Sequence, residues 1–344
     1  MFETARIPVS VLTGFLGSGK TTLLRSFLRD PAAADTAVVI NEFGEIGLDH
    51  TLVEAVDGET VVMASGCVCC SIRTDLADTL MSLAGRVENG DLPPFRRLVI
   101  ETTGLADPAP IVQLMLADER VSRIYGLHQL ITTVDAVNGG SQLDEHLECL
   151  KQAAMADTLL VTKTDMNKSA ERLEARLGRI NPHARLRRAK MGDIDFDWLL
   201  DSPWHDPARR SESVRDWLGA EALDLHHQNG DHDHSHHQDV NRHDARITAF
   251  TLIIEEPVEW MTFSMWLSFV LTAHGAQLLR LKGILNLVGT DTPVAIHGVQ
   301  HLLHEPVALS AWPDEDRTSK LVFIASDLQA EEIQQSWREF AGAR

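Results

Sequence analysis

The chain has 344 residues, of which 44% are hydrophobic, and this length exceeds that of one average domain. We therefore expect two domains. The formal net charge of −19 argues against a nucleic-acid partner and against an anionic membrane, because both would repel an acidic surface. No apolar segment opens the chain, and the most apolar run, residues 260–273, is too short to span a bilayer, which predicts a cytoplasmic protein.

A glycine-rich octapeptide, GFLGSGKT at residues 14–21, matches the pattern G-x-x-x-x-G-K-[ST] of phosphate-binding loops, or P-loops. Residues 9–12 before it are typical of a buried strand and residues 22–28 after it of a helix, so phosphate would meet a helix N-terminus. In this pattern Lys20 reaches the outer phosphates, which makes it a catalytic candidate, and the Thr21 hydroxyl binds Mg²⁺. The nucleotide-binding candidates here are Gly14, Gly17, Ser18, Gly19, Lys20, Thr21 and Thr22. The alternative is a glycine-rich turn that binds no ligand.

Two further loops follow predicted strands and carry acidic residues. The loop NEFGEIG at residues 41–47 follows a predicted strand at 36–40 and is expected to sense γ-phosphate and Mg²⁺, with Glu42 as a catalytic candidate. A solvated acidic turn is the alternative. After the predicted strand 97–100, the catalytic candidates Glu101 and Gly104 resemble a Walker B acid joined to a DxxG switch. Glu101 would hold a water on Mg²⁺, and Gly104 can bring its N–H close to the γ-phosphate because it lacks a Cβ.

The predicted strand 158–161 runs into TKTD, residues 162–165, which resembles the guanine-reading pattern [NT]KxD. Asp165 would accept two N–H bonds that guanine offers and adenine does not, while the stem of Lys163 would lie along the base. Thr162 stands where asparagine is commoner. Upstream, the pattern predicts a strand at 130–134 and a single helix that carries apolar positions from 143 to 154. A guanine motif at a strand end downstream of a P-loop predicts GTP as the ligand.

Three of the four cysteines lie together in CVCC, residues 67–70. They fall between a short predicted strand at 61–64 and a predicted helix whose apolar face holds positions 72, 76, 80 and 83. A helix N-terminus favours the thiolate form, and three thiolates can supply part of a tetrahedral shell around Zn²⁺. Inert buried cysteines and a redox pair are the alternatives. Cys149 lies in the predicted 143–154 helix and is expected to be a packing residue.

The composition changes between residues 201 and 246, where a polar tract rich in histidine and aspartate spans residues 226–237. Such a tract cannot bury enough apolar surface to fold, so we expect a disordered linker that captures metal weakly and exchangeably. A solvated spacer is the alternative. The metal-binding candidates in the tract are His232, His234, His236 and His237.

The C-terminal part is predicted to be an α+β module with a largely antiparallel sheet. Its predicted strands are residues 247–254, 278–287, 294–300, 307–312 and 321–325, and its predicted helices are 259–273 and 330–340. A histidine cluster there, His297, His301 and His304, is expected to be structural. The predicted fold class is therefore α/β, a P-loop NTPase with a mostly parallel sheet flanked by helices, followed by a C-terminal α+β domain. The predicted domains are residues 1–205 for the nucleotide, 206–245 for the linker and 246–344 for the C-terminal module.

Taken in order, these motifs, the histidine tract and the α+β tail resemble the CobW family of P-loop GTPases, and within it the YjiA-type zinc-binding members. The resemblance covers nearly the whole chain. It implies a Mg²⁺-dependent GTPase of the SIMIBI class that binds a transition metal, zinc first with cobalt and nickel as alternatives, and delivers it to a metalloprotein client. It also implies Cys67, Cys69 and Cys70 as thiolate ligands and Glu45 as a carboxylate ligand. Ile40 stands where such relatives place a glutamate, which puts the full coordination shell in question.

Three functions therefore stay open at the level of sequence. The first is a GTP-driven metallochaperone, and the second is a metal buffer whose nucleotide site is only regulatory. The third is an ATP-dependent kinase that shares only the P-loop, which the TKTD tetrapeptide disfavours. A homodimer is compatible with each of them.

Overall fold

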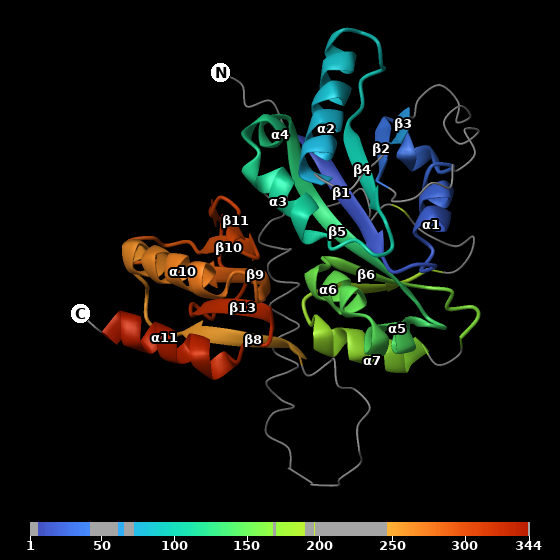
Figure 1. Ribbon diagram of the computed structural model, residues 1–344. Helices are drawn as coiled ribbons and strands as arrows, with labels where there is room; N and C mark the ends of the chain where they lie inside the picture. Colours follow the sequence, from blue (N-terminus) through green and yellow to red (C-terminus); the bar gives the residue numbers. More distant parts are fainter. Residues whose placement is uncertain are drawn as a thin grey trace. The chain divides into compact units, whose positions relative to one another are not determined.

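The computed structural model describes residues 6–41, 61–64, 72–167, 170–189, 196 and 246–342. The chain divides into two compact units (Figure 1). Unit 1 comprises Met1–Gly140, Ala156–Glu174 and Arg185–Ser202, and unit 2 comprises Ser141–Met155, Ala175–Ala184 and Pro203–Arg344. The predicted domain boundaries near residues 205 and 245 lie outside the described residues and stay a prediction. No helix in the described ranges is long and apolar enough to cross a membrane.

A parallel sheet forms the centre of unit 1. In its described part, seven strands follow the order β3-β2-β4-β1-β5-β6-β7, and every neighbouring pair is parallel. The strands are β1 (Ile7–Gly14), β2 (Thr36–Asn41), β3 (Val61–Ala64), β4 (Arg97–Thr102), β5 (Tyr125–Asp135), β6 (Thr158–Thr162) and β7 (Arg185–Arg188). The central strands read as nearly continuous apolar runs, because a parallel sheet is buried on both faces. The predicted α/β class is confirmed.

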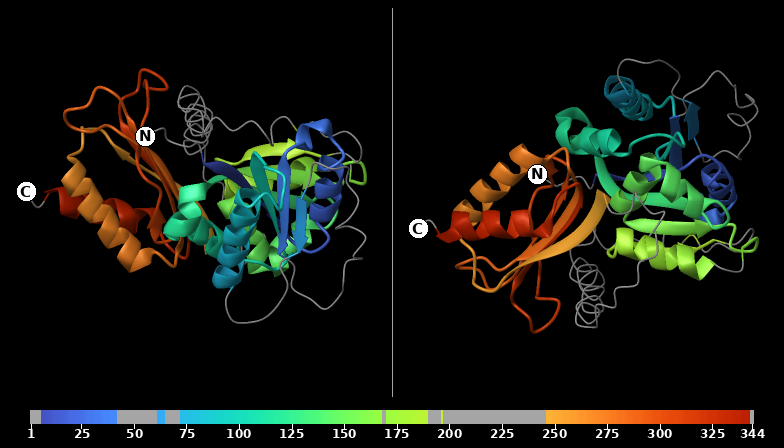
Figure 2. Two further views of the ribbon diagram at one scale, coloured as in Figure 1. Left: turned by 90° about the horizontal axis from the view of Figure 1, so that it is seen from above. Right: turned by 60° about the horizontal axis from the view of Figure 1, so that its bottom comes forward.

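Helices cover both faces of this sheet. Helix α1 (Lys20–Phe27) buries Leu23, Leu24 and Phe27 in a cluster with inward-facing residues of β1, β2, β4, β5 and β6. The chain moves in opposite directions from β1 to β2 and from β3 to β4, so right-handed crossovers place α1 and α2 (Ile72–Glu88) on opposite faces. Figure 2 shows the two helices on opposite sides of β2. The other described helices before residue 189 are α3 (Ala109–Ala117), α4 (Glu119–Ile124), α5 (Gly139–Glu145), α6 (Leu147–Met155) and α7 (Ala170–Ile180).

The register of the strands brings their carboxyl ends level at one edge of the sheet. Glu101 on β4 lies opposite Leu12 on β1, and Gly14 at the end of β1 lies opposite Thr133 on β5. Asp135 at the end of β5 lies opposite Thr162 at the end of β6. The loops that follow these strands therefore meet at the edge where ligands bind in open α/β sheets.

The single helix predicted over residues 143–154 is wrong, because the chain forms two helices, α5 and α6, with a break at His146. The N–H of His146 still donates to the carbonyl of Gln142 in the α-helical pattern. The N–H of Cys149, however, donates to the carbonyl of His146 only three residues back, and a new helix starts there. The apolar spacing continues across the break, so hydrophobic periodicity alone does not reveal it.

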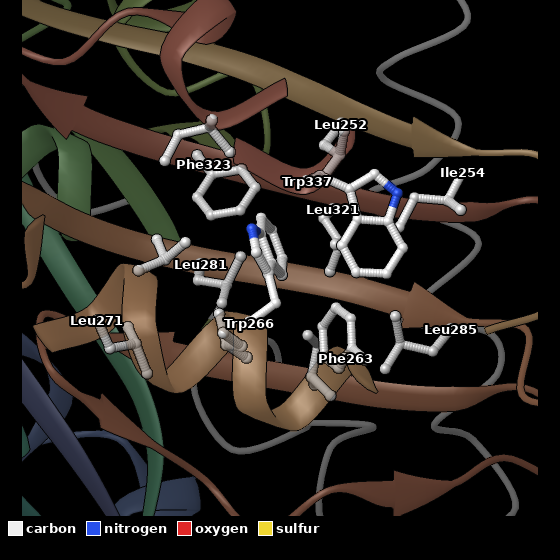
Figure 3. Packing of buried hydrophobic residues seen from close by; sticks show 14 of the residues in the cluster. Leu252, Ile254, Phe263, Trp266, Leu271, Leu281, Leu285, Leu321, Phe323 and Trp337 are labelled. Carbon is white, nitrogen blue, oxygen red and sulfur yellow. The ribbon is translucent and has the colours of Figure 1, made fainter. Parts of the chain in front are cut away.

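Unit 2 contains the predicted antiparallel sheet. Among its described residues the strand order is β11-β10-β9-β13-β8, with β12 also paired to β10, and these pairs are antiparallel. The strands are β8 (Ile247–Ile254), β9 (Leu278–Leu285), β10 (Val294–Val299), β11 (Leu302–Leu303), β12 (Val307–Ala308) and β13 (Ser319–Ser326). The described helices in the C-terminal part of this unit are α10 (Trp260–His274) and α11 (Ala330–Gly342). Figure 3 shows Phe263 and Trp266 rising from α10 toward Trp337, and the two tryptophan rings meet edge to face at 5.1 Å.

Two C-terminal predictions need comment. The strand predicted at 307–312 extends only over Val307–Ala308. The Leu309 N–H still donates to the Pro293 carbonyl in the register of the β10–β12 pair, but proline has no N–H to continue the ladder. Of the three clustered histidines, His297 and His304 stack with their ring planes 3° apart and their centroids at 4.4 Å. Among the described residues no group of three or more His, Cys, Asp or Glu side chains could hold a metal ion.

Candidate nucleotide-binding site

The glycine-rich loop joins β1 to α1 as the sequence predicts. Gly14 has φ 139°, and a Cβ at this position would lie 2.8 Å from the Ser18 hydroxyl oxygen and closer still to Thr133, so only glycine fits. The Ser18 hydroxyl is fully buried and hydrogen-bonds that of Thr133 at 2.6 Å. Helix α1 begins at Lys20, so the N-terminus of the helix faces the loop.

Lys20 folds back onto the loop that precedes it. Its side chain is only 8% exposed, and its Nζ donates to the carbonyl of Gly14 at 2.7 Å and to that of Phe15 at 3.3 Å. The ammonium is thereby kept beside the loop backbone whose amides face a bound phosphate in this motif. This position is compatible with the role that the sequence predicts for Lys20 at the outer phosphates.

Thr21 and Glu101 form the part of the site that suits Mg²⁺. The Thr21 hydroxyl donates to Oε1 of Glu101 at 2.8 Å, which links the first turn of α1 to strand β4. Glu101 is 5% exposed, and the neighbouring Thr102 donates to the Thr13 hydroxyl at 2.8 Å. A hydroxyl and a carboxylate are oxygen donors of the kind that Mg²⁺ binds, so the donor chemistry fits that ion.

Gly104, three residues after Glu101, lies directly against the P-loop. A Cβ at Gly104 would lie 2.7 Å from the backbone nitrogen of Leu16 and 2.8 Å from its Cα. The loop after β4 and the P-loop are thus in backbone contact. This position is compatible with the role that the sequence assigns to Gly104, an N–H close to the outermost phosphate.

The TKTD tetrapeptide also touches the P-loop. Thr162, at the end of β6, donates from its hydroxyl to the carbonyl of Ser18 at 2.7 Å. Lys163 donates from Nζ to the carbonyl of Gly17 at 2.8 Å. Asp165 is exposed to solvent, so its carboxylate is accessible to a ligand. The base-reading and phosphate-binding candidates are therefore neighbours in space, although more than 140 residues separate them in the chain.

Sequence patterns alone do not single out Asp135, which ends β5 and belongs to the same site. Its carboxylate is 1% exposed and accepts bonds from Lys163 Nζ at 2.8 Å, the Val137 N–H at 2.8 Å and the Asn138 side chain at 3.0 Å. Burial acts to raise the pKa of Asp135, but the bonds from Lys163, Val137 and Asn138 outweigh it and hold that pKa below its ordinary value. The available signal was an acidic residue directly after an apolar strand, as at Glu101, but Asp135 lacks the glycine three residues on that completes the pattern there.

The other predicted site residues divide into two groups. Thr22 is exposed in the first turn of α1, and Gly17 and Gly19 both adopt positive φ in the P-loop. Cys149, which is predicted to be a packing residue and not a site residue, is buried in α6; burial, with a smaller effect of the Glu148 charge, raises the pKa of its thiol to about 12, which fits that prediction. The predicted site residues that lie outside the described part of the chain are Glu42, Glu45, Cys67, Cys69, Cys70, His232, His234, His236 and His237.

Comparison with known proteins places both parts of the chain. Residues 8–188 match the family described as CobW/HypB/UreG, nucleotide-binding domain, and residues 247–341 match the cobalamin synthesis protein cobW C-terminal domain. The chain is 34% identical to the zinc chaperone YjiA of Escherichia coli over 338 residues, covering 98% of this chain and 99% of the relative. It is 28% identical to the zinc chaperone CobW of Pseudomonas aeruginosa, covering 95% and 90%. The structure of the Zn(II)-bound YjiA GTPase from E. coli superposes with a TM-score of 0.70 at 30% identity, covering 99% of this chain and 100% of the other.

Proposed function

The chain belongs to the CobW family of P-loop GTPases, and on this premise we propose that it is a GTP-hydrolysing metallochaperone. It binds a transition metal, most simply zinc, at the Cys-x-Cys-Cys element and transfers it to a client protein. The family resemblance found in the sequence is confirmed. The metal site and the client transfer are the proposed steps.

The contact of Lys163 with the P-loop carries the nucleotide half of this proposal. Its ammonium lies 2.8 Å from the Gly17 carbonyl and 2.8 Å from Oδ2 of Asp135, so the TKTD turn is attached to the phosphate-binding loop. One ligand that has both a guanine base and phosphates would use both halves at once. An ATP-dependent kinase would not need this carboxylate-bearing turn beside its P-loop.

For hydrolysis, each described residue has a role that its position supports. The P-loop amides hold the phosphates, and Lys20 stabilises charge that develops on the outer phosphate oxygens. Thr21 and Glu101 would hold Mg²⁺, which supplies further charge neutralisation at the β- and γ-phosphates when bound. Gly104 lies close enough to the P-loop to offer its N–H to the same phosphate. Glu42 remains the catalytic candidate for the water.

The described strand ends support a link between the nucleotide site and the proposed metal ligands. Ile40 on β2 lies opposite both Ala64 on β3 and Glu101 on β4, so the carboxyl ends of the three strands are level. In the chain, Glu42 and Glu45 follow the end of β2, and Cys67, Cys69 and Cys70 follow the end of β3. The proposed metal ligands thus follow the ends of β2, which is next to the strand of Glu101, and of β3, which is one strand further out. The relatives named zinc chaperones make zinc the first metal to test.

The test is whether nucleotide and metal binding are coupled. Co²⁺ is titrated into the protein with a non-hydrolysable GTP analogue, with GDP or with no nucleotide, and thiolate-to-Co²⁺ charge-transfer absorption reports sulfur ligation. Coupling predicts roughly 5- to 150-fold tighter Co²⁺ binding with the GTP analogue, and metal must tighten the analogue by the same factor. Cys69→Ala should remove the coupling and spare nucleotide binding, whereas the matched control Cys149→Ser should keep both.

Two results would count against the chaperone cycle. Equal Co²⁺ affinity in all three nucleotide states would favour the metal buffer with a regulatory nucleotide site. Loss of the tight Co²⁺ site on deletion of residues 226–237 would mean that the histidine tract, including His232, His234, His236 and His237, supplies ligands to it. In the proposed function this deletion removes only weak, exchangeable metal equivalents and leaves GTP turnover unchanged.

A further inference from the structure

Three loops of unit 1 are joined by hydrogen bonds around Asp135. The Ala136 N–H donates to the carbonyl of Thr162 at 3.0 Å, and the Asn167 side chain donates to the carbonyl of Ala136 at 2.5 Å. Besides the ion pair between Asp135 and Lys163, the loop after β5 is therefore bound once to the TKTD turn, at Thr162, and once to Asn167, two residues beyond it. Because Lys163 also reaches Gly17, the P-loop is the third member of this assembly.

The buried negative charge of Asp135 requires the positive charge of Lys163 to compensate it. Burying a carboxylate to 1% exposure lowers the free energy of unfolding considerably unless a nearby positive charge compensates it. Backbone and amide N–H donors from Val137 and Asn138 satisfy some of its lone pairs, and among the described residues the cation that contacts it is the Lys163 ammonium. Removing either side chain would leave the other charge without its counter-charge in this ion pair.

Both the side chain and the backbone of Lys163 are fixed in one conformation. Its Nζ is 2.8 Å from both Asp135 Oδ2 and the Gly17 carbonyl, and its backbone adopts φ 55°, which is uncommon for a residue other than glycine. A free lysine side chain would lose considerable rotamer entropy on ordering against a ligand. Here the ordering is already present, so a base that packs along the stem meets a preorganised surface.

We propose, on the basis of the GTP-binding function above, that Asp135 is a positioning residue that preorganises Lys163 and thereby determines the affinity for guanine nucleotides. It does not touch the phosphates, and it acts on the ligand through the lysine. The loop after β5 thus becomes a determinant of nucleotide selectivity that the tetrapeptide pattern does not contain. Removing the carboxylate should weaken binding in the ground state and the transition state alike.

A double-mutant cycle tests this role in the full chain. Dissociation constants of fluorescent GTP and ATP analogues with Mg²⁺ are measured for wild type, Asp135→Asn, Lys163→Met and the double variant. Loss of a hydrogen bond between charged groups should weaken GTP binding roughly 10- to 100-fold in either single variant. The double variant should be no worse than Lys163→Met alone, because both substitutions remove the same interaction. The KM for GTP should rise while kcat at saturation stays within about 3-fold of wild type.

Three further variants separate positioning from folding. Asn138→Ala removes an amide donor to Asp135 but keeps Lys163 bound, so it should weaken GTP binding much less. Asp144→Asn is the matched control, since Asp144 accepts from Arg176 at 2.7 Å in a similar ion pair outside these three loops, and it should leave the GTP affinity unchanged. If Asp135→Asn does not fold, Asp135→Ser keeps an acceptor for the Val137 N–H and should show the same loss.

The outcomes distinguish this inference from the function on which it rests. A wild-type protein with no preference for GTP over ATP would overturn both the guanine assignment and the role of Asp135. A wild-type preference for GTP that persists in Asp135→Asn and Asp135→Ser would overturn the role of Asp135 alone. Multiplicative losses in the double variant would also overturn it, because they would show that Asp135 acts independently of Lys163.

Discussion

Gly104→Ala tests the contact between the loop after β4 and the P-loop most directly. The added Cβ would lie 2.6 Å from Leu16 Cδ2, 2.7 Å from Leu16 N and 2.8 Å from Leu16 Cα. These distances are about 0.6–0.8 Å shorter than the 3.4 Å at which ordinary contact begins. The Leu16 side chain can rotate away, but its backbone atoms belong to the P-loop and can only move with it. One of the two loops must therefore shift by more than about half an ångström.

Two effects follow from that shift, and they have different sizes. Overpacking of this kind typically lowers the free energy of unfolding by about 1–3 kcal/mol. A displacement of catalytic groups approaching 1 Å can cost about 100-fold in rate. We therefore expect kcat/KM for GTP to fall roughly 10- to 100-fold in a phosphate-release assay, with a lower Tm by calorimetry.

Gly85→Ala is the matched control for this substitution. Gly85 lies inside α2, where a Cβ would meet nothing within 4 Å, so the same added methyl should leave turnover unchanged. It should raise stability by about 0.5–1 kcal/mol, because alanine is the better helix former. Wild-type turnover in Gly104→Ala would refute the inferred contact, and so would an equal loss in Gly85→Ala.

Three further expectations follow from the same structure. Lys20→Ala should reduce GTP turnover by about two to three orders of magnitude while the fold is retained, and near wild-type phosphate release would contradict the P-loop assignment. Asp165→Asn should lower the GTP-over-ATP discrimination by roughly 1–3 kcal/mol in competition binding, since one guanine N–H would lose its acceptor. Tyr125 is the single tyrosine of the chain, is fully buried and donates to the Leu80 carbonyl at 3.0 Å. Burial raises its pKa from 10.0 to about 12. The neutral buried side chain therefore adds at most about 3 kcal/mol to the free energy of unfolding below pH 10, and this contribution is lost between pH 10 and 12. Tyrosinate absorption should therefore show a midpoint near pH 12 in native protein and near 10 in denaturant.

The elements with strong local patterns are those that the sequence predicts well. Strands β1, β2, β4 and β6 appear within a few residues of their expected ranges, because apolar runs next to glycine-rich or acidic loops have few other interpretations. The predicted face of α2 is confirmed where it is described, since Leu76, Leu80 and Leu83 are each at most 2% exposed. Helix α7 and strand β7 are not among the predicted elements. Strand β7 reads RLRR at the sheet edge, where three of its four side chains are exposed and no apolar run forms, whereas α7 does carry a helical pattern, with Leu173, Leu177 and Ile180 buried.

In the site, too, short sequence motifs are predictable, whereas contacts between residues far apart in the chain are not. The phosphate-binding loop, the acid of β4 and the TKTD turn are each complete within a few consecutive residues, so their chemistry is readable before any fold is known. Asp135 carries no such motif. Its importance comes from a parallel pairing that sets it opposite Thr162, and from the reach of Lys163 across that pairing.

The sequence by itself determined the family, the order of the motif-bearing strands and the chemical identity of the nucleotide-site candidates, because each depends on residue types at short, regular spacing. It also proposed a metal site at Cys67, Cys69 and Cys70, which the described residues do not reach. Only the tertiary structure decided which of these motifs are neighbours, that α5 and α6 are separate helices, and that Asp135 holds Lys163 against the P-loop. The physical reason is that strand register and contacts between loops bring together residues far apart in the chain. No periodic pattern in the sequence identifies those contacts.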